Sequence, residues 1–151
     1  MSNNALGTNV IAQIAILVND IDKTSEVYAD VLGVDKPKWF WTEGYKETQT
    51  EYKGEPSDAK AKLAFFNMGN LQLELIEPDQ QPSTWRDHLN EHGEGLHHIA
   101  FIIKGMKEKI AFFESKGMKL IQKGEYTGGR YAYLDTIPQM KILLELLEND
   151  N

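Results

Sequence analysis

The chain contains no cysteine among its 151 residues. Disulfide bonds and thiolate metal ligands are therefore excluded, and any metal site must use oxygen and nitrogen donors. No apolar stretch approaches the length that a membrane-spanning helix needs. The N-terminal sequence MSNNALGTN also lacks the basic and apolar regions of a signal peptide, so we expect a cytoplasmic protein.

Basic residues are scarce, with 16 Lys and Arg against 23 Asp and Glu and a formal net charge of −7. Binding along a nucleic-acid backbone needs clustered Lys and Arg, so we expect neither nucleic acid nor a membrane as a partner. A small anionic substrate stays compatible with this charge, because a local basic patch can outweigh the net value. The length fits one domain, and an apolar fraction of 41% is enough to build its core.

One short phrase occurs twice, as LQLELIE at 71–77 and as ILLELLE at 142–148, an offset of 142 − 71 = 71 residues. The phrase QIAILVNDI is echoed in the same way by HIAFIIKGM. Repetition of this kind indicates two copies of one structural unit. The matched positions that carry side chains able to bind a divalent cation are Gln13, Glu74, His98 and Glu145.

The hydrophobic pattern divides the chain at the same place. Apolar β-branched segments predict strands, and apolar residues at helical spacing predict one helix after the first strand of each half. Each half is β-α-β-β-β in outline, so we predict a single α+β domain over 1–151, with modules at 8–78 and 94–149 joined by a linker and short helix at 79–93. The expected helices are 22–32, 85–91 and 106–116; the expected strands are 10–18, 38–42, 62–67, 71–77, 96–103, 119–122, 131–135 and 142–147, with a further segment near 48–52 and a loop at 124–130.

The repeated glutamates lie inside strongly apolar strands. Alternation places Glu74 on one face with Gln72 and Ile76. A carboxylate there is costly to bury unless it is paired or coordinated. A single strand glutamate more often faces solvent and a single histidine is more often structural, but the recurrence favours a shared metal site. A cation held there would polarise a carbonyl and make a neighbouring C–H acidic.

A glycine-rich segment precedes the strand that begins at Tyr131. We expect Gly129, Arg130 and Tyr131 to lie at the rim of the site, with Arg130 holding a phosphate or carboxylate of the substrate. A hairpin turn with a solvated arginine is an equal alternative. The aromatic residues Trp39, Trp41, Tyr45 and Tyr52 would line a pocket or pack a core or interface.

The remaining histidines are expected to have no role in the site. His88 and His92 flank a helix end, where we expect them to be solvated or capping.

These phrases resemble the vicinal oxygen chelate superfamily, which includes glyoxalase I, methylmalonyl-CoA epimerase, bleomycin-resistance proteins and extradiol dioxygenases. The resemblance covers about 10–147 and rests on QIAILVNDIDKTSEVYADVLGV, LQLELIEP, EGLHHIAFIIKGM and GGRYAYLD…ILLELLE. GLHHIAF and the preceding STWRDHLNEHG are most similar to methylmalonyl-CoA epimerase. The resemblance implies paired βαβββ modules in a cupped, mixed, eight-stranded glyoxalase-like sheet, a metal in the cup, and a homodimer.

The resemblance also implies roles for the repeated residues. Gln13, Glu74, His98 and Glu145 would bind a divalent ion (Zn, Ni, Co or Mn), and Glu74 and Glu145 would be catalytic. His98 is chosen over His97 because it keeps the matched register, and alternation would turn His97 to the opposite face. Epimerases of this type usually have histidine in place of Gln13, whereas some glyoxalase I enzymes have glutamine.

Three departures bear on the activity. Leu17 stands where glyoxalase I has the arginine that holds glutathione, and Pro78 stands in place of an asparagine. The first-half general base of the epimerases would fall near Leu63. We therefore expect a metal-dependent isomerase, epimerase or lyase that acts on a small carbonyl compound through an enolate. The alternatives are a glyoxalase I-like lyase and a metal-free ligand-binding or resistance protein.

Overall fold

The computed structural model describes residues 5–151. The first half contains β1 (Gln13–Leu17), α1 (Ile21–Leu32), β2 (Phe40–Trp41), α2 (Tyr45–Thr48), β3 (Glu51–Tyr52), β4 (Glu55–Pro56), β5 (Ala61–Asn67) and β6 (Gln72–Pro78). α3 (Thr84–His92) joins it to the second half, which contains β7 (Gly95–Ile102), α4 (Met106–Ser115), β8 (Leu120–Tyr126), β9 (Gly129–Leu134), α5 (Ile137–Met140) and β10 (Leu143–Asn149).

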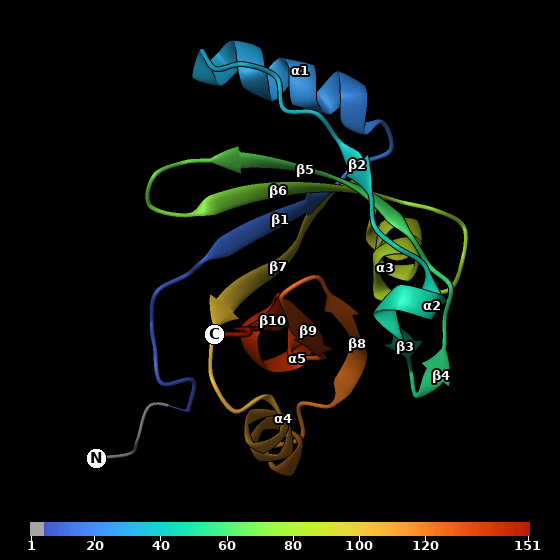
Figure 1. Cartoon of the computed structure of the whole chain (residues 1–151), viewed down its shortest axis with the longest axis vertical. Helices are drawn as coiled ribbons and strands as arrows, with labels where there is room; N and C mark the ends of the chain where they lie inside the picture. Colours follow the sequence, from blue (N-terminus) through green and yellow to red (C-terminus); the bar gives the residue numbers. More distant parts are fainter. Residues whose placement is uncertain (1–4) are drawn as a thin grey trace.

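The two halves build their parts of the sheet in the same way. The sheet order is β2-β5-β6-β1-β7-β10-β9-β8-β3-β4, so each half places its last strand beside its first. β1 runs antiparallel to β7, and this seam joins the halves into one mixed sheet. Figure 1 shows that the sheet curls strongly, with α3 at its open side. The predicted α+β fold with a cupped mixed sheet is confirmed.

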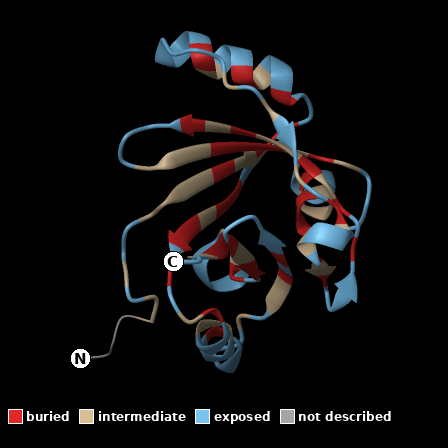
Figure 2. Cartoon of the chain, viewed as in Figure 1, coloured by how far each residue is buried: buried red, intermediate tan, exposed pale blue. Residues whose placement is uncertain are grey.

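The faces of the sheet are buried by different helices. On the concave face, Trp85 and Leu89 of α3 pack in one core cluster with Leu17 and Ile76. On the convex face, α1 covers the first half, where Ile21 packs with Leu75, and α4 covers the second half (Figure 1). The buried residues accordingly follow the strands and the inner sides of the helices, as Figure 2 shows. Within the described chain, no helix is both long and apolar enough to cross a membrane.

The second glutamate of each repeated phrase binds the start of its own module's helix. Glu77 Oε1 accepts the backbone N–H of Ile21, the first residue of α1, at 2.9 Å. Glu148 Oε2 accepts the N–H of Gly105, which caps α4, at 2.7 Å. The N-terminal N–H groups of a helix lack partners within it, and a carboxylate there also offsets the helix dipole. The repeat thus encodes a helix-starting contact in each module.

Among residues 5–151 the sheet has ten strands, where eight were expected. The two additional strands, β3 and β4, form a hairpin from the first half that pairs with the edge of β8 in the second. β3 overlaps the further segment expected near 48–52, whereas β4 was not expected. The expected loop at 124–130 is instead the tight end of the β8–β9 hairpin, because β8 continues to Tyr126 and β9 starts at Gly129. The short helices α2 and α5 were not predicted, since four residues show no periodicity.

Candidate functional site

The strand register brings both repeated glutamates and the second histidine to the concave face. Ala15 of β1 pairs with Glu74 on one side and with His98 on the other. In β10, Glu145 pairs with Ala100 of β7, two residues beyond His98. Directly paired residues share a face of a sheet. The predicted face for Glu74 is therefore the one that the structure shows.

Glu74 and Glu145 converge on the same nitrogen atom of His98. His98 Nε2 lies 3.1 Å from Glu145 Oε1 and 3.4 Å from Glu74 Oε1. His98 is fully buried, and Glu74 and Glu145 are only 6% and 4% exposed. Both contacts are ion pairs, and within residues 5–151 Nε2 is a buried polar atom without a hydrogen-bond partner. Three ionisable groups thus share one dry site at the module seam.

The electrostatics of this cluster follow from its burial. Burial disfavours the charged imidazolium, but the carboxylates of Glu145 and Glu74 outweigh this effect and raise the pKa of His98 to about 9. Burial raises the pKa of the Glu74 carboxyl. At neutral pH a protonated His98 therefore offsets part of the negative charge of this cluster.

His97 lies on the same side of the sheet as His98, which corrects the expectation from strand alternation. The pairing of β1 with β7 shifts between Ala15 and Ile16, because β7 carries one additional residue in a β-bulge. His97 Nδ1 consequently lies 2.7 Å from His98 Nδ1, and His97 Nε2 lies 3.4 Å from Thr84 Oγ1 of α3.

The β-bulge places His97 where it can orient the ring of His98. Burial, together with neighbouring His98 and His88, holds the pKa of His97 well below its ordinary value. A neutral His97 accepts the Nδ1–H of His98, and this bond fixes the orientation of the His98 ring. His98, and not His97, is the histidine that contacts both glutamates.

Gln13 faces the cup but is engaged elsewhere. Its side-chain Nε2 donates to Gln72 Oε1 at 2.5 Å, and the two residues are directly paired between β1 and β6. Gln72 lies two residues before Glu74 on the same face, which strand alternation had indicated. The amide oxygen of Gln13 is the atom that would bind a cation.

The donor set fits a divalent cation in its chemistry. An imidazole nitrogen, two carboxylates and an amide oxygen match the preferences of borderline ions. Atoms bound to one ion at about 2.0–2.2 Å in a tetrahedron lie about 3.3–3.6 Å apart, close to the separations around His98 Nε2. In residues 5–151, however, no three His, Asp or Glu side chains are arranged so as to hold a metal ion. Binding would require deprotonation of His98 at Nε2. The hydrogen bond from Gln13 to Gln72 uses the amide nitrogen of Gln13 and not the oxygen that would bind the ion.

Of the residues predicted at the rim of the site, Tyr131 lies on the concave face of the sheet and Arg130 does not. Tyr131 packs at the edge of the concave core cluster, and its hydroxyl accepts from Gln122 Nε2 at 3.0 Å. Gly129 opens β9, where a Cβ would collide with the carbonyl oxygen of Glu148. Arg130 alternates with Tyr131 and pairs instead with Glu148, Asp150 and Glu125 at 3.2, 2.6 and 3.5 Å. The structure therefore does not bring Arg130 to the cup.

Tyr133 is a site residue that the sequence analysis missed. Its ring centroid lies 5.0 Å from that of His98 and 5.2 Å from that of His97. Its hydroxyl accepts the indole N–H of Trp85 at 3.0 Å. Alternation from Tyr131 is the signal that would have found it, since both tyrosines occupy one face of β9.

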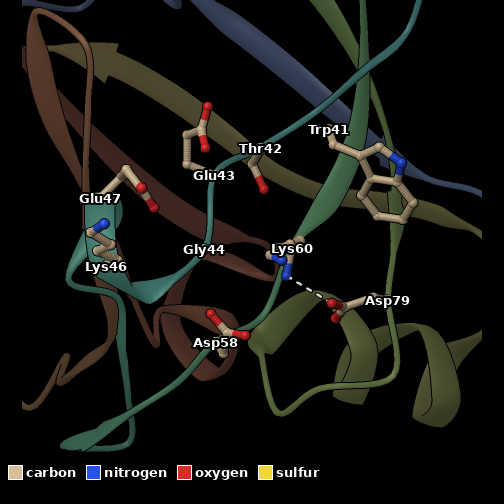
Figure 3. A pocket seen from close by; sticks show the side chains of 9 residues that line it. All are labelled: Trp41, Thr42, Glu43, Gly44, Lys46, Glu47, Asp58, Lys60 and Asp79. Atoms are coloured by element: carbon tan, nitrogen blue, oxygen red, sulfur yellow. Dashed lines mark hydrogen bonds between the residues drawn. The ribbon is translucent and has the colours of Figure 1, made fainter.

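A polar surface hollow of about 680 Å³ lies apart from this cluster. Figure 3 shows its lining side chains, and the Lys60 backbone N–H donates to Asp79 Oδ2 at 3.1 Å. Trp41, one of the aromatic residues expected near a pocket, contributes to this wall. The complete lining is Trp41, Thr42, Glu43, Gly44, Lys46, Glu47, Asp58, Lys60 and Asp79. None of these is a predicted metal ligand, so the hollow is distinct from the cup.

The charge balance predicts opposite titration of the adjacent histidines in protein freed of metal by a chelator. His98 should stay protonated until the pH approaches 9, whereas His97 should stay neutral. Because the folded-state pKa of His98 is raised from 6.5, its stabilising contribution is fully present below about pH 6.5 and is lost as the pH rises through 9. Imidazole NMR titration measures both groups. Loss of the His98 proton near pH 6.5 would contradict this account.

Comparison with known proteins places the fold. Residues 12–133 match the model of the Glyoxalase/Bleomycin resistance protein/Dioxygenase superfamily. The chain is 30% identical over 143 residues to the uncharacterized protein YqjC of Bacillus subtilis (strain 168), covering 93% of this chain and 92% of that one.

Solved structures of the same fold are similar to this chain. The hypothetical protein BH1468 from Bacillus halodurans C-125 matches with a TM-score of 0.65 and 24% identity, covering 93% of this chain and 94% of that one. A Streptomyces coelicolor methylmalonyl-CoA epimerase variant in complex with 2-nitronate-propionyl-CoA matches with a TM-score of 0.63 and 22% identity, covering 95% and 99%. The chain belongs to the glyoxalase, bleomycin resistance protein and dioxygenase superfamily.

Proposed function

We propose that the protein is a metal-dependent isomerase that transfers a proton at the carbon next to a carbonyl group, as an epimerase does. The observation that supports it most is the convergence of two buried glutamates, from equivalent strands of the two modules, on His98. Burying carboxylates costs free energy that apolar side chains at the same positions would not cost. A chemical role accounts for their presence.

In this proposal Gln13, Glu74, His98 and Glu145 hold a divalent cation of the Zn, Ni, Co or Mn type. When bound, such an ion polarises a substrate carbonyl and lowers the pKa of the adjacent C–H. His98 contributes its neutral Nε2, and its Nδ1–H remains bound to His97.

Glu74 and Glu145 are suited to move the proton. They belong to β6 and β10, which flank the β1–β7 seam from opposite sides. In a 1,1-proton transfer, one carboxylate removes the proton from one face of the carbon and the other returns it on the opposite face. A positioned carboxylate is a suitable general base for such a transfer.

An acyl-CoA is the substrate class that the comparisons support, because the similar epimerase was solved with 2-nitronate-propionyl-CoA. A sugar-like hydroxy-ketone is the second class. A glyoxalase I-like lyase is the alternative reaction, with Gln13 in its favour. Against it, Leu17 is fully buried in the core cluster and offers no cation for glutathione.

A metal-free ligand-binding protein of the same fold is the second candidate function. The identity of residue 13 favours it, because the neutral amide of Gln13 is a weaker metal ligand than imidazole and a ligand-binding protein needs no metal donor there. The apolar concave wall formed by Trp85, Tyr131 and Tyr133 would suit a bound ligand equally well. The two candidates differ in whether the cup binds a cation.

We also propose a cytoplasmic homodimer whose partner is a small molecule, with no nucleic-acid or membrane partner. The formal charge of −7 supports the absence of a nucleic-acid partner, which would need clustered Lys and Arg. Closed two-fold dimers are the commonest oligomers.

Metal binding should depend on the first glutamate of each repeated phrase and not on the second. Glu74→Gln and Glu145→Gln should each abolish stoichiometric Zn²⁺ or Ni²⁺ binding in the cup, because an anionic ligand becomes a neutral amide. Glu77→Gln and Glu148→Gln are the matched controls: they lie three residues further on, and an amide oxygen can still accept the helix N–H. Elemental analysis after dialysis measures the bound ion. Equal metal content in all four variants would refute the assignment.

Proton transfer should appear as exchange of the α-hydrogen of methylmalonyl-CoA with solvent deuterium in the metal-loaded protein. A positioned general base contributes about 10²–10⁴-fold, so Glu74→Gln or Glu145→Gln should slow exchange by at least about 100-fold. Mass spectrometry follows deuterium uptake, with Glu77→Gln as the control. No exchange of this substrate or of a hydroxy-ketone by the loaded protein would leave ligand binding as the function.

A further inference from the structure

The four histidines of the chain lie in a row, each ring next to the following one. The ring centroids of His92 and His88 are 4.5 Å apart, those of His88 and His97 are 5.2 Å apart, and those of His97 and His98 are 5.0 Å apart. This row of histidines runs from the exposed His92 to the buried His98. Only the inner two histidines are used by the proposed function.

His88 and His92 have the spacing of a chelating pair. They lie four residues apart on α3, so their side chains project from the same face of the helix, one turn apart. Two histidines at this spacing on a helix are able to bind one transition-metal ion together. Their close rings, tilted by 46°, place both imidazoles at one spot.

The pair also contains an unsatisfied atom. Nδ1 of His88 is buried and has no hydrogen-bond partner among residues 5–151, an arrangement that native proteins seldom leave uncompensated. His92 is more than half exposed, so an ion from solvent can reach the pair.

The surrounding charge favours a cation. His92 is the last residue of α3, at the end where the helix dipole is negative. Glu91 Oε2 lies 3.7 Å from His92 Nε2, and the whole chain is acidic.

We propose that His88 and His92 form a second, outer site for one borderline transition-metal ion, of the Zn²⁺, Ni²⁺ or Cu²⁺ class, separated from the cup by His97. Imidazole is a favoured ligand of these ions. Two protein nitrogens hold the ion and water completes its coordination. The site does not depend on Glu74 or Glu145, so it stands whether or not the cup binds metal. It replaces the expectation that these histidines are only solvated or capping.

The test compares Ni²⁺ and Zn²⁺ binding by calorimetry on the full chain and two variants. His92→Gln removes one ligand at an exposed position that carries no core packing. The matched control, N90H/H92Q, keeps two histidines in α3 but places them two residues apart, where they do not face each other. Far-UV circular dichroism checks the fold of each variant.

We expect His92→Gln to lose one bound equivalent and N90H/H92Q not to restore it. Unchanged stoichiometry in His92→Gln, or full recovery in N90H/H92Q, would overturn the outer site. Glu74→Gln/Glu145→Gln separates this result from the cup. If the cup binds no metal, the double variant binds as many ions per chain as the unmodified protein, and the ion lost in His92→Gln is the single one bound. If the outer site is absent, only the two glutamate changes lower the number of bound ions.

Discussion

Two carboxylates and one imidazole share a dry site where the two modules of the sheet meet. Each group would be costly to bury alone, and each compensates the others. The surrounding residues hold these groups in place. The β-bulge at His97 brings its ring against the His98 ring, and Thr84 of α3 contacts His97. Tyr133 packs against both histidine rings. The cup and the helix at its open side are thus organised around a small set of buried charges.

The repeated phrase explains how one short sequence builds both the site and its scaffold. Its first glutamate, Glu74 or Glu145, turns into the cup, and its second, Glu77 or Glu148, binds the start of the module's helix on the convex face. The spacing of three residues produces this division, because side chains alternate along a strand. The partners of the first glutamates are not symmetric, since Gln13 is bonded to Gln72 whereas His98 contacts both carboxylates.

Much of this arrangement could be predicted from local pattern. A helix was expected at 22–32, and α1 begins where Asp20 accepts the N–H of Lys23 and ends at Gly33, whose φ of 67° is left-handed. The repeat also indicated that Glu74, His98 and Glu145 belong together.

What could not be predicted depends on long-range pairing. The β3–β4 hairpin gains its place only by pairing with β8, and strands of two residues have no periodicity to detect. His97 was placed on the wrong face because a bulge breaks alternation. Arg130 was expected at the rim from its glycine-rich segment. Its three acidic partners come from β8, from β10 and from Asp150 after β10, and only the fold brings them together.

The central claim is that the cup is a metal site and not only a buried ion pair. A crystal structure of the metal-loaded protein, with anomalous scattering at the edge of the metal, tests it most directly. The account predicts an anomalous peak bound by His98 Nε2, Glu74, Glu145 and the amide oxygen of Gln13. A cup with no peak, in which His98 Nε2 still contacts both glutamates, would contradict it.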